Sequence, residues 1–470
     1  MSNLDIRIDD CELYFCPIET RVPLKFGPET TTHVIEARTA IRVRSKDGAE
    51  AVGRGETPLS VAWVWPSSLA YSYRQNRLQD FCRILCELWR TNTDSGHAME
   101  IGHRFIEGSL KDAWNKENAR CNEDEKMPWL AALVCNSLFD LALHDAYGNI
   151  HKVNTWKTFT KEYMNHDLSW YFGEEHGKPF VGKYPADFFA EGADAATSLV
   201  AWHLVGAKDI LEPEGYDGPV VEDGYPFFLT DWIARDGLTC LKVKLTGNDR
   251  DWDYTRLINV GRIANESGVL WLTADFNCTV EDPTYVCDIL DQLLLEQPEI
   301  YAKLLYVEQP FPYDIIAHPI DVRAVSARKP LFMDESAHDW HHVVLGRELG
   351  WSGVALKTCK TLSGALLSLC WAKVHGMTLM VQDLTNPMLA MIPHVSLAAY
   401  AGTIMGVETN AMQFYPMASI HEERIHPGLY VRREGKVDFS TLGRHGFGYR
   451  YDEIEDARIR AKGEDPWVKA

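Results

Sequence analysis

The feature that most constrains the fold is a series of short apolar runs, each ending in a polar residue, between positions 240 and 408. The runs cover residues 240–244, 270–275, 304–308, 330–334, 353–357, 378–383 and 402–408. Their last residues lie 23 to 33 positions apart, which is the length that a strand, a helix and two loops need in a parallel crossover. Together with a strand predicted at 168–172, the pattern predicts an α/β barrel of eight parallel strands.

The regions around this pattern have a different character. Residues 5–53 alternate between apolar and polar side chains and contain turn signals, which predicts a small antiparallel sheet. Residues 75–150 are predicted to be helical, most clearly at 128–148, where Pro128 stands near the start and Gly148 follows the end. The stretch 173–228 is rich in Gly, Pro and aromatic residues and is too long for an ordinary connection, so we interpret it as an insertion that could form a lid.

Composition narrows the classes of partner. The formal net charge of the 470 residues is −20, which argues against a nucleic-acid-binding surface. The 11 cysteines show no paired CxxC pattern, and we expect free thiols in a reducing compartment. The first residues carry no apolar signal segment, and we see no uninterrupted apolar run of membrane-spanning length. We therefore expect a cytoplasmic protein without a membrane or nucleic-acid partner.

Lysines and acidic residues end the predicted strands one after another. In a parallel barrel all carboxyl ends of the strands open on one face, where functional groups gather. A single polar residue at such an end usually caps a loop, but an ordered set of lysines and acids on consecutive units is far less likely to arise by chance. The set consists of Lys244, Asp275, Glu308, Asp334, Lys357, Asp383 and Glu408.

These residue types point to metal-assisted carboxylate chemistry. Converging carboxylates repel one another unless a cation neutralises them, and Asp275, Glu308 and Asp334 are hard oxygen donors of the kind that suit Mg²⁺. Lys242 and Lys244 share one strand face, and two adjacent ammonium groups lower the pKa of a lysine. Lys244 could then remove the proton α to the carboxylate of a small-molecule acid, with Lys357 as a second acid/base group.

At this point the residues resemble a known family. Lys242-Val-Lys244, Asp275 in Ala-Asp-Phe-Asn277, Glu308 in Glu-Gln-Pro, Asp334 in Asp-Glu-Ser and Lys357 in Ala-Leu-Lys are similar to the motifs of the enolase superfamily. Within it, the chain resembles the muconate lactonising subgroup of the mandelate racemase/muconate lactonizing enzyme family, which includes cycloisomerases and dipeptide epimerases. The resemblance spans residues 128–410 and, more loosely, the N-terminal sheet.

The resemblance implies both an architecture and roles. A modified TIM barrel, (β/α)₇β, would occupy 153–410, under an α+β capping domain from 1–152 on which the C-terminal segment 411–470 packs. Lys244 and Lys357 would be the catalysts, Lys242 their tuning neighbour, and Asp275, Glu308 and Asp334 the Mg²⁺ ligands, in a chemistry known to use a Lys or His base with Mg²⁺. Segments 21–30 and 51–56 would close over the substrate. We add, as candidate substrate contacts, Asn277, Asp383, Glu408 and Phe26, and we expect a homo-oligomer.

The substrate and the reaction stay open. Dipeptide epimerases usually carry Asp-x-Asp at the last strand, where this chain has Glu408-Thr-Asn410, and mandelate racemase-type dehydratases use a His–Asp pair where this chain has Lys357 and Asp383. A racemase, epimerase or cycloisomerase is the leading hypothesis. A dehydratase that performs β-elimination is the alternative, followed by a non-catalytic acid-binding relative and an unrelated metal hydrolase. We expect His338, His341 and His342 to form a solvated loop or helix start rather than a second metal site, Trp63 to be a core residue, and Lys360 to line only the rim.

Overall fold

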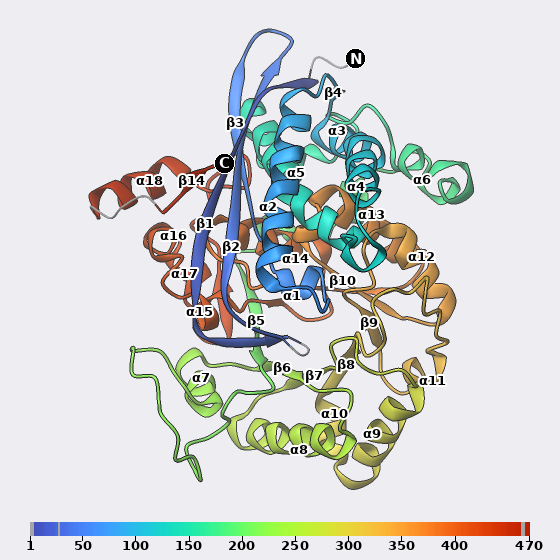
Figure 1. Cartoon of the computed structure of the whole chain (residues 1–470), viewed down its shortest axis with the longest axis vertical. Helices are drawn as coiled ribbons and strands as arrows, with labels where there is room; N and C mark the ends of the chain where they lie inside the picture. The colour runs from blue at the N-terminus through green and yellow to red at the C-terminus, as the bar shows by residue number, and fades with distance from the viewer. Residues whose placement is uncertain (1–3, 27–28, 462–465) are drawn as a thin grey trace.

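Eight parallel strands form a nearly closed barrel in the larger part of the molecule (Figure 1). The structure is a computed structural model, and it describes residues 4–26, 29–461 and 466–470. The strands are β5 (Ser198–Val205), β6 (Cys240–Lys244), β7 (Trp271–Asp275), β8 (Leu304–Glu308), β9 (Leu331–Met333), β10 (Gly353–Leu356), β11 (Thr378–Val381) and β12 (Val407–Glu408). Their spatial order is β11-β10-β9-β8-β7-β6-β5-β12. The amide of Ile404 donates to the carbonyl of Leu379 at 2.8 Å, which links the chain before β12 to β11.

Helices alternate with these strands, as the spacing predicts. Between β5 and β12 lie α7 (Leu229–Asp236), α8 (Arg250–Ser267), α9 (Pro283–Glu296), α10 (Pro298–Lys303), α11 (Arg323–Ser326), α12 (Trp340–Leu349), α13 (Leu362–Val374) and α14 (Met391–Ala401). The barrel interior is filled by large side chains, among them Trp202, Tyr306 and Phe332. The predicted fold class is therefore confirmed, and β6 and β8 have the predicted bounds.

The first barrel strand, however, is not the predicted one. Residues 168–172 open a helix, α6 (Leu168–His176), because Asp167 caps it by accepting from the amide of Ser169 at 3.0 Å. Leu168, Tyr171 and Phe172 are buried on one helical face, at i, i+3 and i+4. The first strand is β5, which lies inside the stretch interpreted as an insertion. Its run Ser-Leu-Val-Ala-Trp-His-Leu-Val is apolar enough to have been recognised.

An antiparallel sheet covers the barrel mouth together with the first group of helices (Figure 1). Its strands are β1 (Ile6–Phe26), β2 (Glu29–Ser45), β3 (Glu50–Pro58), β4 (Ser95–Gly96) and β14 (Val468–Lys469). The helices are α1 (Val61–Val64), α2 (Tyr71–Arg90), α3 (Ala98–Phe105), which continues through a π-helical turn into α4 (Lys111–Asn118), and α5 (Trp129–His151). The predicted sheet and helices of this region are confirmed.

One of the two predicted closing segments is a core strand instead. Residues 51–56 lie within β3, which packs directly on α5. A Cβ built on Gly53 would lie 2.1 Å from the carbonyl oxygen of Ala142, and one on Gly55 would lie 2.0 Å from that of Leu138. These glycines therefore serve close packing of strand on helix, and they are not the hinges of a loop.

Helix α5 is buried over most of its length and packs against β2 and β3. The segment Glu123–His151 is the only helical stretch of the described residues that is long and apolar enough to cross a membrane by length and composition. In its most apolar window, 89% of the residues are buried inside the protein. That burial is what the core helix of a folded domain shows.

The C-terminal segment contacts both parts. It contains α15 (Ala411–Phe414), α16 (Ile420–Ile425), α17 (Pro427–Tyr430), β13 (Lys436–Asp438) and α18 (Tyr451–Arg460). β13 pairs with β5 of the barrel, and β14 pairs with β1 of the antiparallel sheet. The guanidinium of Arg38 on β2 lies over the ring of Trp467, with 4.0 Å between the two centres.

Candidate active site

The charged residues that end consecutive strands lie side by side at the barrel mouth. In the parallel register, Lys244 of β6 is paired with Asp275 of β7, and Asp275 with Glu308 of β8. Asp334 follows the last residue of β9. The carboxyl ends of parallel strands meet at one edge, and the structure brings these groups together there.

Lys242 is the central cation of this group. Its Nζ lies 2.6 Å from Glu308 Oε1, 3.2 Å from Asp275 Oδ2 and 3.3 Å from Glu408 Oε2. Burial would lower the pKa of Lys242, but Glu308 and the other carboxylates raise it well above its ordinary value. Lys242 is therefore a fixed positive charge that holds acids from three strands.

The wall on the β6–β7 side contains Lys244. Its Nζ donates to Asp275 Oδ2 at 2.5 Å and to Asn277 Oδ1 at 2.7 Å, and 14% of its side chain is exposed. Burial would raise the pKa of Asp275, but the nearby Lys244 and Lys242 lower it strongly. Asn277 has a left-handed backbone with φ of 53°, which its short polar side chain tolerates, and this turn brings its amide back to Lys244.

The opposite wall contains two lysines that share Asp334. Lys357 Nζ lies 3.0 Å from Asp334 Oδ2 and 2.9 Å from the carbonyl oxygen of Asp383, while Lys360 Nζ lies 2.5 Å from the carbonyl oxygen of Asp334. Both lysines are buried. The interpretation of Lys360 as a rim residue is thus wrong, because its ammonium contacts a group at the centre of the site.

The pKa of Lys357 has the direction opposite to the one that a base requires. Burial would lower it, but Asp334 raises it above its ordinary value. For Asp334 itself, burial would raise the pKa, and Lys357 and Lys360 lower it. In this arrangement the ion pair holds the proton on Lys357.

Glu308 lies deepest in the site. Its two oxygens accept from Lys242 Nζ and from Gln382 Nε2. Burial and the nearby Asp275 raise the pKa of Glu308 well above its usual range. In this arrangement burial and Asp275 therefore favour the protonated, uncharged form of Glu308.

Asp383 and Glu408 lie in the same wall, but other groups already engage their carboxylates. Asp383 accepts from the amides of Asn386 at 2.8 Å and Asn410 at 2.6 Å. Glu408 accepts from Lys242, from the amide of Asp383 at 3.2 Å and from Asn410 Nδ2 at 2.8 Å. Both residues stay predictions as substrate contacts, and their present bonds fit a role in ordering the last two strands.

The donor set suits a hard divalent cation. Asp275, Glu308 and Asp334 bring three buried carboxylates from adjacent strands, and oxygen donors of this kind are what Mg²⁺ takes. Among the described residues no three Asp, Glu, His or Cys side chains are arranged to hold a metal ion. Lysine ammonium groups lie against the oxygens of Asp275, Glu308 and Asp334. The chemistry of the residues therefore fits Mg²⁺, whose binding would replace lysine contacts.

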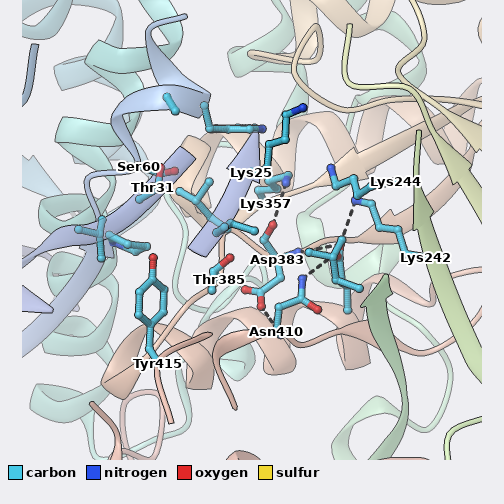
Figure 2. Close-up of a pocket in the computed structure, with 18 of the residues that line it drawn as sticks. Lys25, Thr31, Ser60, Lys242, Lys244, Lys357, Asp383, Thr385, Asn410 and Tyr415 are labelled. Carbon is cyan, nitrogen blue, oxygen red and sulfur yellow. Dashed lines mark hydrogen bonds and ion pairs between the residues drawn. The ribbon is translucent and has the colours of Figure 1, made fainter. Parts of the chain in front are cut away.

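A cavity opens between these strand ends and the antiparallel sheet (Figure 2). Residues from distant parts of the chain line it: Leu24, Lys25 and Thr31 from the β1–β2 hairpin, Ser60 and Trp63 around α1, and Thr385, Asn410 and Tyr415 from the barrel and C-terminal segment. The predicted closing segment 21–30 thus reaches the cavity, although residues 27–28 lie outside the described residues. Phe26 ends β1, and its side chain is also outside the described part of the chain.

Several of these wall residues escaped the sequence interpretation. Ser60 and Trp63 follow β3 of the antiparallel sheet rather than a barrel strand, and Tyr415 follows α15, so only the folded chain brings them to the mouth. Trp63 is largely buried, as expected of a core residue, but it also lines the cavity. His341 and His342 follow Asp339, the cap of α12, as a helix start should. His338 is buried, so its expected solvation is wrong.

The comparisons with known proteins agree with this architecture. Residues 228–455 match the family model described as enolase C-terminal domain-like. These residues, which include β6 to β12 of the barrel, belong to the enolase superfamily. No curated protein matches it.

Solved structures resemble this chain over nearly its whole length. A dipeptide epimerase from Enterococcus faecalis, complexed with Mg and L-Leu-L-Tyr, is 14% identical with a TM-score of 0.60, over 94% of this chain and 99% of that one. A muconate lactonizing enzyme from Pseudomonas fluorescens, complexed with muconolactone, is 15% identical with a TM-score of 0.55, over 94% and 96%. An N-succinyl Arg/Lys racemase from Bacillus cereus is 13% identical with a TM-score of 0.58, over 96% and 98%. At such identities the likeness shows the fold alone.

Proposed function

We propose that this protein is a Mg²⁺-dependent racemase or epimerase that moves the proton α to the carboxylate of a small-molecule acid. The observation that carries the proposal is the placement of two lysines across the barrel. Lys244 ends β6 and Lys357 follows β10, and these strands are four places apart in an order of eight, on opposite sides of the mouth. The carboxylates of β7, β8 and β9 lie between them.

Two opposed lysines suit a reaction at both faces of one carbon. In its neutral form, one Nζ takes the α proton: the C–H bond breaks, an N–H bond forms, and the electron pair stays on the substrate as an enolate. The ammonium of the opposite lysine then returns a proton to the other face. A cycloisomerisation needs a proton transfer from only one lysine, so two well-placed lysines favour racemisation or epimerisation.

The carboxylates and Lys242 set the conditions for this transfer. Asp275, Glu308 and Asp334 would hold Mg²⁺, which supplies positive charge for the negative charge that develops on the substrate. Asp334 is what raises the pKa of Lys357, so a cation that shared the charge of Asp334 would lower that pKa and favour the neutral form of Lys357. Lys242 then keeps Glu308 and Glu408 in place with a fixed positive charge.

The test is α-proton exchange in D₂O, followed by proton NMR with Mg²⁺ present. A suitable panel is L-Leu-L-Tyr, D-Ala-L-Val, N-succinyl-arginine, N-succinyl-lysine and mandelate, because the related structures handle acids of these kinds. We expect exchange with inversion for at least one acid and none after chelation of the metal. Exchange that survives in a variant lacking both Lys244 and Lys357 would contradict the proposal, as would the absence of exchange with the whole panel.

A further inference from the structure

Trp63 connects the antiparallel-sheet region to two lysines at the mouth of the barrel, Lys357 and Lys360. It lies on α1, yet its ring centroid is 4.7 Å from Lys357 Nζ and 5.8 Å from Lys360 Nζ. Its Nε1 donates to Glu335 Oε1 at 2.9 Å. A single side chain thus contacts the segments that follow both β9 and β10.

We propose that Trp63 is a positioning residue that holds the ammonium group of Lys357 at the cavity wall. The inference rests on the proposed function for the role of Lys357 as one of two acid/base groups. It adds one requirement to that function. Proton transfer at one face of the substrate carbon would depend on a residue of the covering region, which is the antiparallel sheet with helices α1 to α5.

The contacts of Lys357 leave one side of its ammonium group to Trp63. An ammonium group has three N–H donors, and two oxygen atoms of the barrel, Asp334 Oδ2 and the carbonyl oxygen of Asp383, lie at 3.0 and 2.9 Å. The indole face lies within cation–π distance on the remaining side. A lysine side chain has four rotatable bonds, so a rigid neighbour of this kind narrows the positions that its Nζ can take.

Glu335 fixes the plane of the indole. Both Glu335 and Trp63 are buried, and the N–H···O bond between them orients the ring so that its face is presented to Lys357 and Lys360. The bond crosses from the covering region to the barrel, with 272 positions between the two residues in sequence. Movement of α1 relative to the barrel would therefore move the wall of Lys357.

The first experiment does not depend on activity. Lysines of wild type, Trp63→Phe and Trp63→Leu are modified with an amine-reactive reagent, and the rates at Lys357 and Lys244 are read by peptide mass spectrometry. We expect Trp63→Leu to raise the rate at Lys357 roughly 3- to 30-fold, the range of a cation–π contact, and to leave Lys244 unchanged. Trp63→Phe keeps an aromatic face and should stay close to wild type. An unchanged rate at Lys357, or an equal rise at both lysines, would overturn the inference.

The second experiment reads the two faces of the reaction. The Lys244→Met and Lys357→Met variants assign each face of α-proton exchange to one lysine. Trp63→Leu should then slow the Lys357 face roughly 3- to 30-fold in kcat with a smaller change in KM, and Trp63→Phe should restore most of the rate. Equal slowing at both faces would overturn the inference. If wild type exchanges no acid, the proposed function fails, and the modification rates still decide the role of Trp63.

Discussion

The two lysine walls of the barrel mouth are built from different parts of the molecule. Lys244 is held by Asp275 and Asn277, which follow it by 31 and 33 positions on the next strand and its turn. Lys357 is held by Asp334 and Asp383 and covered by Trp63, which comes from the antiparallel-sheet region nearly 300 residues earlier. The first wall follows from barrel geometry alone, whereas the second also requires the correct placement of the covering region.

This difference has a chemical consequence. The side chain of Lys244 is 14% exposed and that of Lys357 only 4%. Water therefore has more access to the first wall, and the second should depend more strongly on its fixed contacts. If both lysines act on one substrate carbon, the two faces should respond differently to changes that loosen the structure.

The largest effects are expected when each of the two lysines is replaced in turn. Lys244→Met and Lys357→Met retain the chain length but lose the ammonium group. Each variant should slow proton exchange on one face of the substrate carbon by up to about 10⁴-fold, because a general acid or base raises the rate of proton transfer 10²- to 10⁴-fold. Stereospecific exchange in D₂O, followed by NMR, measures both faces. If either variant lost both faces while it still bound Mg²⁺, the two-wall model would be wrong.

A second change tests the charge that both walls share. Lys242→Met leaves Glu308, Glu408 and Asp275 without their common cation. Removal of one partner from a buried ionic group costs about 3 to 5 kcal/mol, so the metal-free variant should unfold at lower denaturant concentration. Mg²⁺ should raise the melting temperature of the variant more than that of wild type, because the cation replaces the missing positive charge. Equal shifts in both proteins would argue against carboxylate ligation at this position.

The sequence predicted the surroundings of Lys244 better than those of Lys357, because the contacts of Lys244 come from the next strand along the chain. Lys244, Asp275 and Glu308 end consecutive strands, and Lys242 lies on the same face of β6 two residues before its end. Strand periodicity and spacing therefore sufficed to place these four residues together. Strand β5 itself was missed, and the first strand was predicted at 168–172, because the glycine- and proline-rich stretch around β5 was interpreted as an insertion. No pattern along the chain could bring Trp63 to Lys357, since that contact depends on how α1 packs across the mouth.

The packing of the C-terminal segment on the antiparallel sheet offers a test with pH. Glu422 on α16 is buried beside Glu56 and Arg38 of the antiparallel sheet, and burial and Glu56 raise its pKa to about 7. The folded protein therefore keeps a proton that the unfolded chain releases near pH 4.5. Stability from this group is fully present below about pH 4.5 and is lost as the pH rises through 7.

Glu422→Gln should remove this dependence. We expect the variant to be more stable than wild type at pH 8 by up to about 3 kcal/mol, and the difference to shrink toward pH 5. Urea unfolding at several pH values measures it. If the covering region supports mainly the Lys357 wall, exchange on that face should also fall more steeply with pH in wild type than in the variant. A difference that stayed constant with pH would show that Glu422 is not the titrating group.

The smallest effect is expected at Asn277, which contacts Lys244. Asn277 has a φ of 53°, so Asn277→Gly keeps the backbone geometry and removes only the side chain that accepts from Lys244. Loss of one hydrogen bond to a partly exposed ammonium group should cost about 1 kcal/mol and slow exchange on the Lys244 face about fivefold. The Lys357 face should keep its rate, because its contacts with Trp63, Asp334 and Asp383 do not include Asn277. Equal slowing on both faces would mean that Asn277 supports the carboxylates shared by the two walls rather than Lys244 alone.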